Sequence, residues 1–351
     1  MAPIGVAIVG GGIFAKEEHL PAVEATDHLS LKAIYSRSRK SAEDTAKLAT
    51  KSGSPDLYSD DSGDGRSFKD LLARDDIQAL IVALPIVNQP EYIEQALAAG
   101  KHVLAEKPIA ADVARAQGLI EYYNKISADK GVTFAVAENY RFQPRHLAAR
   151  DEIRKLGKVI GFNVRVFSLV KLGGKYIETA WRKQPAYQGG FLLDGGVHFA
   201  AALRLVLGEE AAPASVAAFS DLAREHLPPI DTINAIVKTK SGASGSFSVS
   251  MGTSLSAYDL EVAGENGSVI LSRDDLTVKP LDGEARTTHF KYTSGVKEEV
   301  QAWAEGLVPG EPNPLQSPQE ALADLEFLEK IFRSGEQDGA PQKLQLQLQL
   351  Q

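Results

Sequence analysis

The stretch Pro3-Ile4-Gly5-Val6-Ala7-Ile8-Val9-Gly10-Gly11-Gly12-Ile13-Phe14-Ala15 stands near the start of the chain and decides its fold. Its apolar run leads directly into a G-x-G-x-x-A loop at residues 10–15. Glycines at the first and third positions of such a loop permit a tight turn and let backbone N–H groups approach a pyrophosphate. The stretch therefore predicts a β-strand, a phosphate-binding turn and a helix. A glycine-rich turn without a ligand is the alternative for this loop taken alone.

Beyond the loop, short apolar runs alternate with segments of helical period as far as about residue 136. This alternation is typical of a parallel sheet whose strands are joined by crossover helices. The predicted strands cover residues 4–9, 31–35, 79–83, 102–105 and 133–136, and the predicted helices cover 41–50, 91–99 and 112–127. We therefore expect residues 1–138 to form a doubly wound parallel sheet of the Rossmann type, within an α/β fold.

The pattern changes after residue 139, where alternating strands are joined by turns rich in Gly and Ser. This favours an antiparallel meander, with strands at 161–170, 233–237, 247–251, 259–263, 268–271, 276–279 and 287–292. Ser317-Pro318 opens a late helix at 317–333 that carries apolar residues on one face. We expect residues 139–351 to form an α+β domain for substrate binding and oligomerisation, with an open, mostly antiparallel sheet and with the late helix packing back toward the first domain.

The composition excludes several classes of function. The chain has 351 residues, enough for about two domains, and 44% of them are hydrophobic. Its 38 basic against 46 acidic residues give a net charge of −8, which disfavours nucleic acid and anionic lipid as partners. Without cysteine there are no disulfides, thiolate nucleophiles or Cys-ligated metals, and we assign no metal site. With no signal sequence or membrane-spanning run recognised, we expect a soluble, cytoplasmic protein.

At the C-terminus of the chain, residues 344–351 alternate Leu and Gln. This pattern fits either an edge strand or a frayed tail, and terminal residues generally favour the frayed tail.

At the end of the second predicted strand, an NAD enzyme places an acidic residue that binds the ribose 2′-hydroxyl. Here Ser36 stands there instead, followed by Arg37, Ser38, Arg39 and Lys40.

This turn after the second strand favours NADP over NAD as the cofactor. It has no carboxylate that would repel a 2′-phosphate, and its Arg and Lys side chains could bind one. Lys40 is the weakest of these candidates, because it stands where its side chain can also point along the following helix. A solvated basic turn is the alternative, although basic residues at the start of a helix oppose its dipole unless an anion is near.

Glu106-Lys107-Pro108 follows the strand predicted at 102–105. Loops at the carboxyl ends of parallel strands form the ligand crevice of such a sheet, and a proline fixes the chain where it turns. A partly desolvated lysine beside a carbonyl or an alcohol can donate or accept a proton. Lys107 is therefore a candidate acid–base residue, with a plain surface turn as the alternative for the tripeptide alone.

Four motifs in this order resemble those of the Gfo/Idh/MocA oxidoreductase family. They are G-x-G-x-x-A at 10–15, A-E-K-P at 105–108, A-E-N-Y-R-F-Q-P at 137–144 and G-G-F-L-L-D-G-G-V-H at 189–198. The resemblance spans nearly the whole chain. It implies a Rossmann domain followed by an open, mostly antiparallel sheet domain, with the nicotinamide and the substrate bound between them.

The resemblance also implies roles for three catalytic residues. The family's E-K-P lysine, which contacts substrate and takes part in proton transfer, falls on Lys107. Its D-x-G-x-H pair falls on Asp194, which would orient a substrate hydroxyl, and His198, which would act as general acid or base. Asp194 and His198 stand four positions apart and would share one helix face, and we expect the two glycines between them to leave room for a ligand. A capping aspartate with a hydrogen-bonded core histidine is the alternative.

The chain departs from the family pattern near the substrate. Ile86 and Gln89 stand where the family often carries Asn and His, whereas Pro85 is retained beside the expected nicotinamide. Trp181-Arg182 is similar to the family's W-R pair, which could contact an anionic or polyhydroxylated substrate. The alternative is that Trp181 belongs to the core and Arg182 does not touch the ligand. We assign no role to His19 or Tyr187. The expected cofactor-binding residues are Gly10, Gly12, Ile13, Phe14, Ser36, Arg37, Lys40, Pro85, Glu106 and Lys107, and the expected substrate-binding residues are Lys107, Asn139, Arg182, Asp194 and His198.

Together these features predict an oxidoreductase that uses NADP(H) as cofactor. Its substrate would be the carbonyl or secondary alcohol of a sugar, a polyol or a related small polar molecule. The exposed face of the second sheet predicts a homo-oligomer, most simply a dimer. Two alternatives remain, a glycosidase that uses a tightly held NAD for transient oxidation and a regulatory protein that senses a dinucleotide without turnover.

Overall fold

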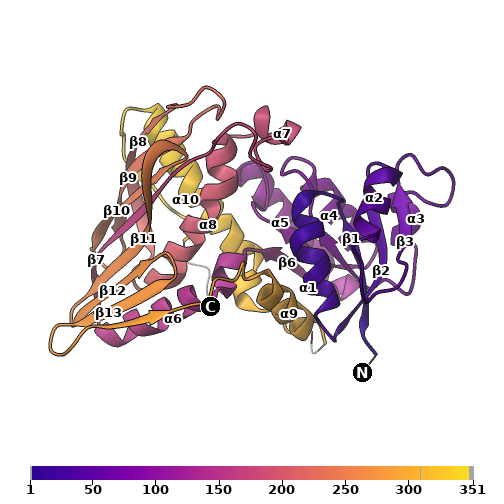
Figure 1. Ribbon diagram of the computed structural model, residues 1–351, viewed down its shortest axis with the longest axis horizontal. Helices are drawn as coiled ribbons and strands as arrows, with labels where there is room; N and C mark the ends of the chain where they lie inside the picture. Colours follow the sequence, from indigo (N-terminus) through magenta and orange to yellow (C-terminus); the bar gives the residue numbers. More distant parts are fainter. Residues whose placement is uncertain (1, 309, 348–351) are drawn as a thin grey trace. The chain divides into compact units, whose positions relative to one another are not determined.

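The computed structural model describes residues 2–308 and 310–347. The chain divides into two compact units (Figure 1). The first contains Met1–Asn139 and Gly295–Ala321, and the second contains Tyr140–Ser294 and Leu322–Gln351. The division between the units thus falls one residue after the position predicted from the sequence. The segment that returns to the first unit carries helix α9 (Val296–Leu307) and only the start of the late helix, α10 (Pro318–Glu336).

The first unit is built on a six-stranded sheet with the order β3-β2-β1-β4-β5-β6. Every pair of neighbouring strands in it is parallel, which confirms the predicted doubly wound sheet. The strands are β1 (Ile4–Val9), β2 (Leu29–Ser36), β3 (Asp56–Ser59), β4 (Ala79–Val82), β5 (His102–Glu106) and β6 (Phe134–Ala137). Strand β3 was not predicted, because its four residues include too few apolar positions to form a recognisable run.

Helices of the first unit begin and end where the local sequence dictates. Asp112 caps α5 by accepting a hydrogen bond from the N–H of Arg115 at 2.8 Å, and Gly131 ends it in the left-handed region. The unit contains η1 (Ala15–His19), α1 (Leu20–Glu24), α2 (Arg39–Ala46), α3 (Phe68–Leu72), α4 (Gln89–Ala98), α5 (Val113–Lys130), α9 and η4 (Pro314–Gln316).

Helix α9 was not predicted, although its sequence carries the signal of an amphipathic helix. Val296, Val300, Trp303 and Leu307 repeat at helical spacing and are all buried. They join the apolar core formed by β1, β2, η1 and α1. The return of the chain to the first unit is therefore explained by the burial of this one apolar face.

The second unit is built on a nine-stranded sheet with the order β14-β13-β12-β11-β7-β10-β9-β8-β15. Strands β7 and β10 pair in parallel, and the other neighbouring strands that the structure describes run antiparallel, as predicted. The strands are β7 (Val159–Leu169), β8 (Pro213–Asp221), β9 (Thr232–Thr239), β10 (Ser244–Ser250), β11 (Gly252–Gly264), β12 (Gly267–Ser272), β13 (Asp275–Pro280), β14 (Arg286–His289) and β15 (Gln342–Lys343).

Helices α6 (Pro144–Ile153) and α8 (Gly190–Leu207) and the greater part of α10 pack on one face of this sheet (Figure 1). The unit also contains the short η3 (Arg154–Leu156) and α7 (Ala180–Lys183), while η2 (Asn139–Phe142) begins at the division between the units. Helix α8 is long and apolar enough to cross a membrane, but 83% of it is buried in the protein. It is therefore best explained as the core helix of this unit.

A buried charge network joins α8, α10 and the segment that follows β6. The carboxylate of Asp324 accepts hydrogen bonds from Arg141 at 2.5 Å and from Arg204 at 2.6 Å. The side chains of Asp324, Arg141 and Arg204 are 1%, 2% and 6% exposed. Burial of charged groups is tolerated only with such pairing, so these contacts fix the two arginines and the helices together.

The first half of the Leu/Gln tail is held against the second unit and does not fray. Glu326 accepts hydrogen bonds from the N–H groups of Gln345 and Leu346, and Gln347 accepts one from Arg204 at 2.7 Å. Because residues 344–347 satisfy buried polar groups of α8 and α10, the expectation of a frayed tail is wrong for them. Residues 348–351 lie outside the described residues.

Candidate functional site

The glycine loop after β1 is closely packed at its first two glycines and open at its third. Gly10 has a φ of +125°, and a Cβ there would lie 2.2 Å from the carbonyl oxygen of Ala83 at the end of β4. A Cβ on Gly11 would lie 2.3 Å from the hydroxyl of Ser41, whereas one on Gly12 would meet nothing within 4 Å. The first two glycines thus allow close packing, and the third leaves its backbone open to a ligand at the start of the helix.

The turn after β2 contains one basic side chain without an internal partner. Lys40 pairs with Asp44 at 2.8 Å along its own helix, and Arg39 pairs with Glu43 at 2.9 Å. Arg37 is exposed and makes no ion pair within residues 2–308 and 310–347. Ser36 is buried and adjoins Gly11. Arg37 is therefore the one cation of residues 36–40 that remains available for a 2′-phosphate.

Asp61 lies beside this turn and was not predicted. Strand β3 ends next to β2, with Ser59 opposite Ser36 in the register, so the loop that follows β3 adjoins the basic turn. The carboxylate of Asp61 accepts hydrogen bonds from the hydroxyl of Ser59 and the N–H of Arg39, both at 2.6 Å, and these bonds lower its pKa. An ionised carboxylate here works against a second anion, so an NADP assignment depends on Arg37.

Gln89 holds the segment that carries Lys107. Its amide donates hydrogen bonds to the carbonyl oxygens of Glu106, at 2.9 Å, and Pro108, at 3.4 Å. These two carbonyls stand on either side of Lys107, which is half-buried. Glu106 is the last residue of β5. Gln89 thus holds the backbone on both sides of Lys107.

The predicted site residues of the first unit gather at the carboxyl edge of its sheet. Gly10, Gly12, Ile13 and Phe14 follow β1, Ser36 and Arg37 end and follow β2, Pro85 follows β4, Glu106 and Lys107 end and follow β5, and Asn139 follows β6. Lys40 is already in the first turn of α2 and points along that helix. The carboxyl edge is where ligands bind in open α/β sheets.

In the second unit the structure brings Arg182 and Asp194 into direct contact. Nε of Arg182 lies 2.6 Å from Oδ2 of Asp194. Asp194 stands in the second turn of α8. The guanidinium also lies over two aromatic rings, 3.9 Å from the centroid of Trp181 and 5.4 Å from that of Tyr176. This cluster combines a carboxylate with aromatic faces and a fixed cation, which suits a polyhydroxylated or anionic ligand.

His198 lies one turn further along α8 and stacks on Tyr140. Their ring centroids are 4.4 Å apart with an interplanar angle of 15°, and His146 stacks on Tyr140 at 5.3 Å. The hydroxyl of Tyr140 is hydrogen-bonded to Tyr258, whose pKa is raised by burial and by Tyr140. The plane of the predicted catalytic imidazole is therefore set by an aromatic neighbour that directly follows Asn139 in the sequence.

Side chains of the second unit adjoin the two glycines between Asp194 and His198. A Cβ on Gly195 would be 3.4 Å from the methyl of Met251, and one on Gly196 would be 3.7 Å from Leu328. Both distances are ordinary van der Waals contacts, so these neighbours do not require glycine at either position. The expectation that the two glycines leave room for a ligand stays a prediction.

Three tyrosines around the second-unit cluster were missed or left unassigned. Tyr140 and Tyr176 contact His198 and Arg182 respectively, and only the position of Tyr140 within a motif could have signalled its role. Tyr187 is buried, and burial together with the nearby charge of Asp194 raises its pKa. Within the described part of the chain, no group of three or more His, Cys, Asp or Glu side chains could hold a metal ion.

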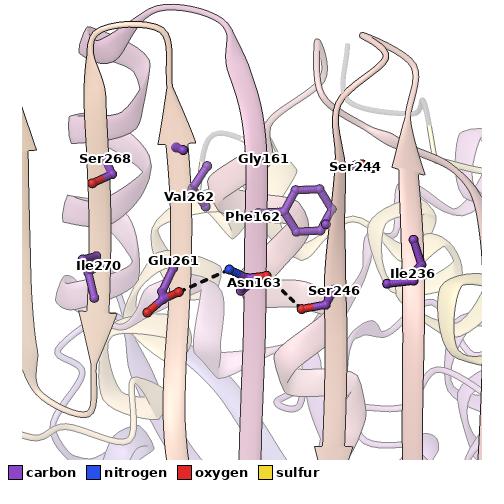
Figure 2. Close-up of a pocket in the computed structure, with 12 residues that line it drawn as sticks. Gly161, Phe162, Asn163, Ile236, Ser244, Ser246, Glu261, Val262, Ser268 and Ile270 are labelled. Carbon is purple, nitrogen blue, oxygen red and sulfur yellow. Dashed lines mark hydrogen bonds between the residues drawn. The ribbon is translucent and has the colours of Figure 1, made fainter. Parts of the chain in front are cut away.

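A shallow groove on the nine-stranded sheet lies among β7, β9, β10, β11 and β12, away from the residues described above (Figure 2). Across its floor, Asn163 donates a hydrogen bond to Glu261 at 3.4 Å and accepts one from Ser246 at 3.0 Å. Ile236 and Ile270 flank these polar residues. Because its polar groups already bind one another and no predicted site residue lines it, the groove is not a candidate active site.

Comparison with known proteins gives a family match over most of the chain. The model of an oxidoreductase family with an NAD-binding Rossmann fold matches residues 4–136. The model of the same family's C-terminal alpha/beta domain matches residues 150–344. The two matches correspond to the two kinds of sheet in the structure.

Individual relatives match the chain along nearly its whole length. It is 42% identical to dehydrogenase FPY6 of Fusarium mangiferae, with 96% of this chain and 98% of that protein covered. It is 27% identical to D-xylose 1-dehydrogenase (NADP(+)) 2 of Haloferax volcanii, with 95% and 98% covered. Among solved structures, an oxidoreductase from Thermotoga maritima is similar at 30% identity with a TM-score of 0.86, with 97% and 98% covered.

Proposed function

The chain belongs to the Gfo/Idh/MocA oxidoreductase family, and from this premise we propose that it is an NADP(H)-dependent enzyme. Its reaction would interconvert a carbonyl and a secondary alcohol in a sugar, a polyol or a related small polar molecule. The observation that carries the proposal is the placement of Lys107 at the same sheet edge as the open glycine loop. A relative that is named as an NADP-dependent xylose dehydrogenase supports the choice of cofactor and substrate class.

The roles of the residues follow from their chemistry. The loop at residues 10–15 would hold the pyrophosphate of the dinucleotide and Arg37 its 2′-phosphate, and the bound cofactor would supply hydride chemistry at its nicotinamide. Lys107 or His198 would donate a proton to the carbonyl oxygen in reduction and remove it from the hydroxyl in oxidation. Asp194, oriented by Arg182, would accept a hydrogen bond from a neighbouring substrate hydroxyl. Asn139, at the end of β6, would donate or accept a further hydrogen bond.

The activity is tested by following nicotinamide absorbance while sugars and polyols in both oxidation states are offered to the purified protein. The proposal expects stoichiometric, substrate-dependent consumption of NADPH or formation of NADPH from NADP. A glycosidase with tightly held NAD would release sugar while its copurified cofactor is not consumed. A dinucleotide-sensing regulatory protein would bind the cofactor without turnover. Either of these results would contradict the proposal.

Arg37→Ala is expected to weaken NADPH binding by about 10- to 100-fold, equivalent to about 1.4 to 2.8 kcal/mol. The substitution removes the charge that would pair with the 2′-phosphate, so NADH binding should not change. Arg39→Ala is the matched control, because Arg39 stands in the same turn but already pairs with Glu43. Calorimetric titration with both nucleotides measures the effect. NADH bound as tightly as NADPH by the wild-type protein would refute the NADP preference.

We also propose that the open face of the nine-stranded sheet pairs with a second copy of the chain. Ile236, which lines the groove of Figure 2, and Phe219 of β8 are 60% and 65% exposed on this face. Light scattering should give a mass twice 37.7 kDa, and Ile236→Glu should restore the monomer. Leu281→Glu, at an exposed residue outside the strands, should leave the dimer intact. A wild-type mass of 37.7 kDa would contradict the proposal.

A further inference from the structure

A buried contact joins His19 to Glu106, and the proposed function gives it no role. Nε2 of His19 lies 2.6 Å from Oε1 of Glu106, although the two residues are 87 positions apart in the sequence. The side chain of His19 is fully buried and that of Glu106 is 12% exposed. Glu106 directly precedes Lys107. A buried histidine therefore contacts the segment that presents the proposed catalytic lysine.

The position of His19 is determined by the helix that begins at the glycine loop. His19 ends the π-helical turn η1, which directly follows Phe14. Such turns are rare within helices and occur frequently at functional sites, because they change which side chains share a helix face. Ala15 and Leu20, on either side of this turn, are part of the apolar core, and Phe14 contacts the imidazole edge-on at 5.4 Å. His19 is thus held rigidly by the element that would bind the pyrophosphate.

A second contact holds the same segment from another side. Gln89 donates to the carbonyl oxygens of Glu106 and Pro108 and is itself fully buried. The backbone on both sides of Lys107 is therefore fixed by Gln89, while the side chain before Lys107 is fixed by His19. The lysine side chain is long and flexible, so the position of its backbone limits which atoms its amine can reach.

We propose that His19 is a positioning residue that connects the phosphate-binding helix to Lys107 through the carboxylate of Glu106. The inference rests on the proposed function, because it requires Lys107 to act on the substrate oxygen. His19 does not take part in proton transfer itself. A displacement of about 1 Å at a reacting group can cost about 100-fold in rate, so a contact that fixes this segment has a measurable effect on kcat.

The first test is the substitution His19→Leu, which removes the contact with Glu106 and keeps an apolar side chain in the core. It should lower kcat by about 10- to 100-fold while the Kd for NADPH stays within about threefold. His19→Gln carries an amide that can reach Glu106 and should restore kcat to within about threefold of the wild type. His28→Leu is the control, because His28 is exposed in the same unit. Equal kcat in His19→Leu and wild type would overturn the inference.

The second test asks whether His19 acts through Lys107. In a Lys107→Ala background, His19→Leu should cause no further loss of kcat, because the group that it positions is gone. A merely structural role would lower the rate equally in both backgrounds, and that result would overturn the inference. If His19→Leu fails to fold, His19→Met removes the same contact and is judged by the same comparison. A wild-type protein without turnover would refute the proposed function, whereas turnover with additive losses would refute only this inference.

Discussion

Lys107→Ala is expected to lower kcat for carbonyl reduction by about 100- to 10,000-fold. The substitution removes the amine that would donate a proton as charge appears on the substrate oxygen. Because the glycine loop and Arg37 remain, NADPH should bind with a loss of no more than about tenfold, or about 1.4 kcal/mol. Steady-state kinetics on a substrate found in the absorbance screen, together with NADPH titration, measures both quantities.

Lys130→Ala provides the control for this prediction. Lys130 is exposed at the end of α5 in the same unit, so its removal changes the net charge equally without touching the sheet edge. Its kcat should equal that of the wild type. Turnover by Lys107→Ala at the wild-type rate would show that the catalytic assignment is wrong, whatever the cofactor affinity.

Asp324→Ala is expected to lower the free energy of unfolding of the second unit by about 3 to 5 kcal/mol. The substitution removes the carboxylate to which the buried guanidinium groups of Arg141 and Arg204 both donate hydrogen bonds. Removal of one partner from a buried ion pair is strongly destabilising, because the remaining charge loses an interaction that offset the cost of its burial. Denaturant unfolding followed by circular dichroism measures the change.

Glu336→Ala is the matched control, because Glu336 is an exposed acidic residue on the same helix. It should change the free energy of unfolding by less than about 0.5 kcal/mol. Because the chain has two units, their transitions must be separated before the free energies are compared. A loss below about 1 kcal/mol for Asp324→Ala would mean that water or other groups compensate the two arginines.

The sequence predicts the parts of the fold that depend on local pattern. Strands with continuous apolar runs, such as β1 and β4, and helices with clear caps, such as α5, are found within a few residues of their expected positions. Strand β3 was missed because it is short and begins with an exposed Asp. The contacts of Asp324 were out of reach, because Arg141 and Arg204 are 183 and 120 positions away in the sequence.

The residues of the candidate site also fall into those that local sequence motifs predict and those that contacts between distant segments determine. The glycine loop and Lys107 were predictable because both lie in short motifs directly after apolar strands. The neighbours of those motifs were not, since Asp61 depends on β3 and His19 depends on a π-helical turn that has no simple sequence signature.

We propose that Lys107, at the carboxyl edge of the first unit's sheet, exchanges a proton with the substrate oxygen. A crystal structure of the protein with NADP and a polyol substrate tests this claim most directly. We predict that Nζ of Lys107 lies about 2.6 to 3.2 Å from a hydroxyl oxygen of the polyol. A bound polyol that makes no contact with Lys107 would contradict the claim.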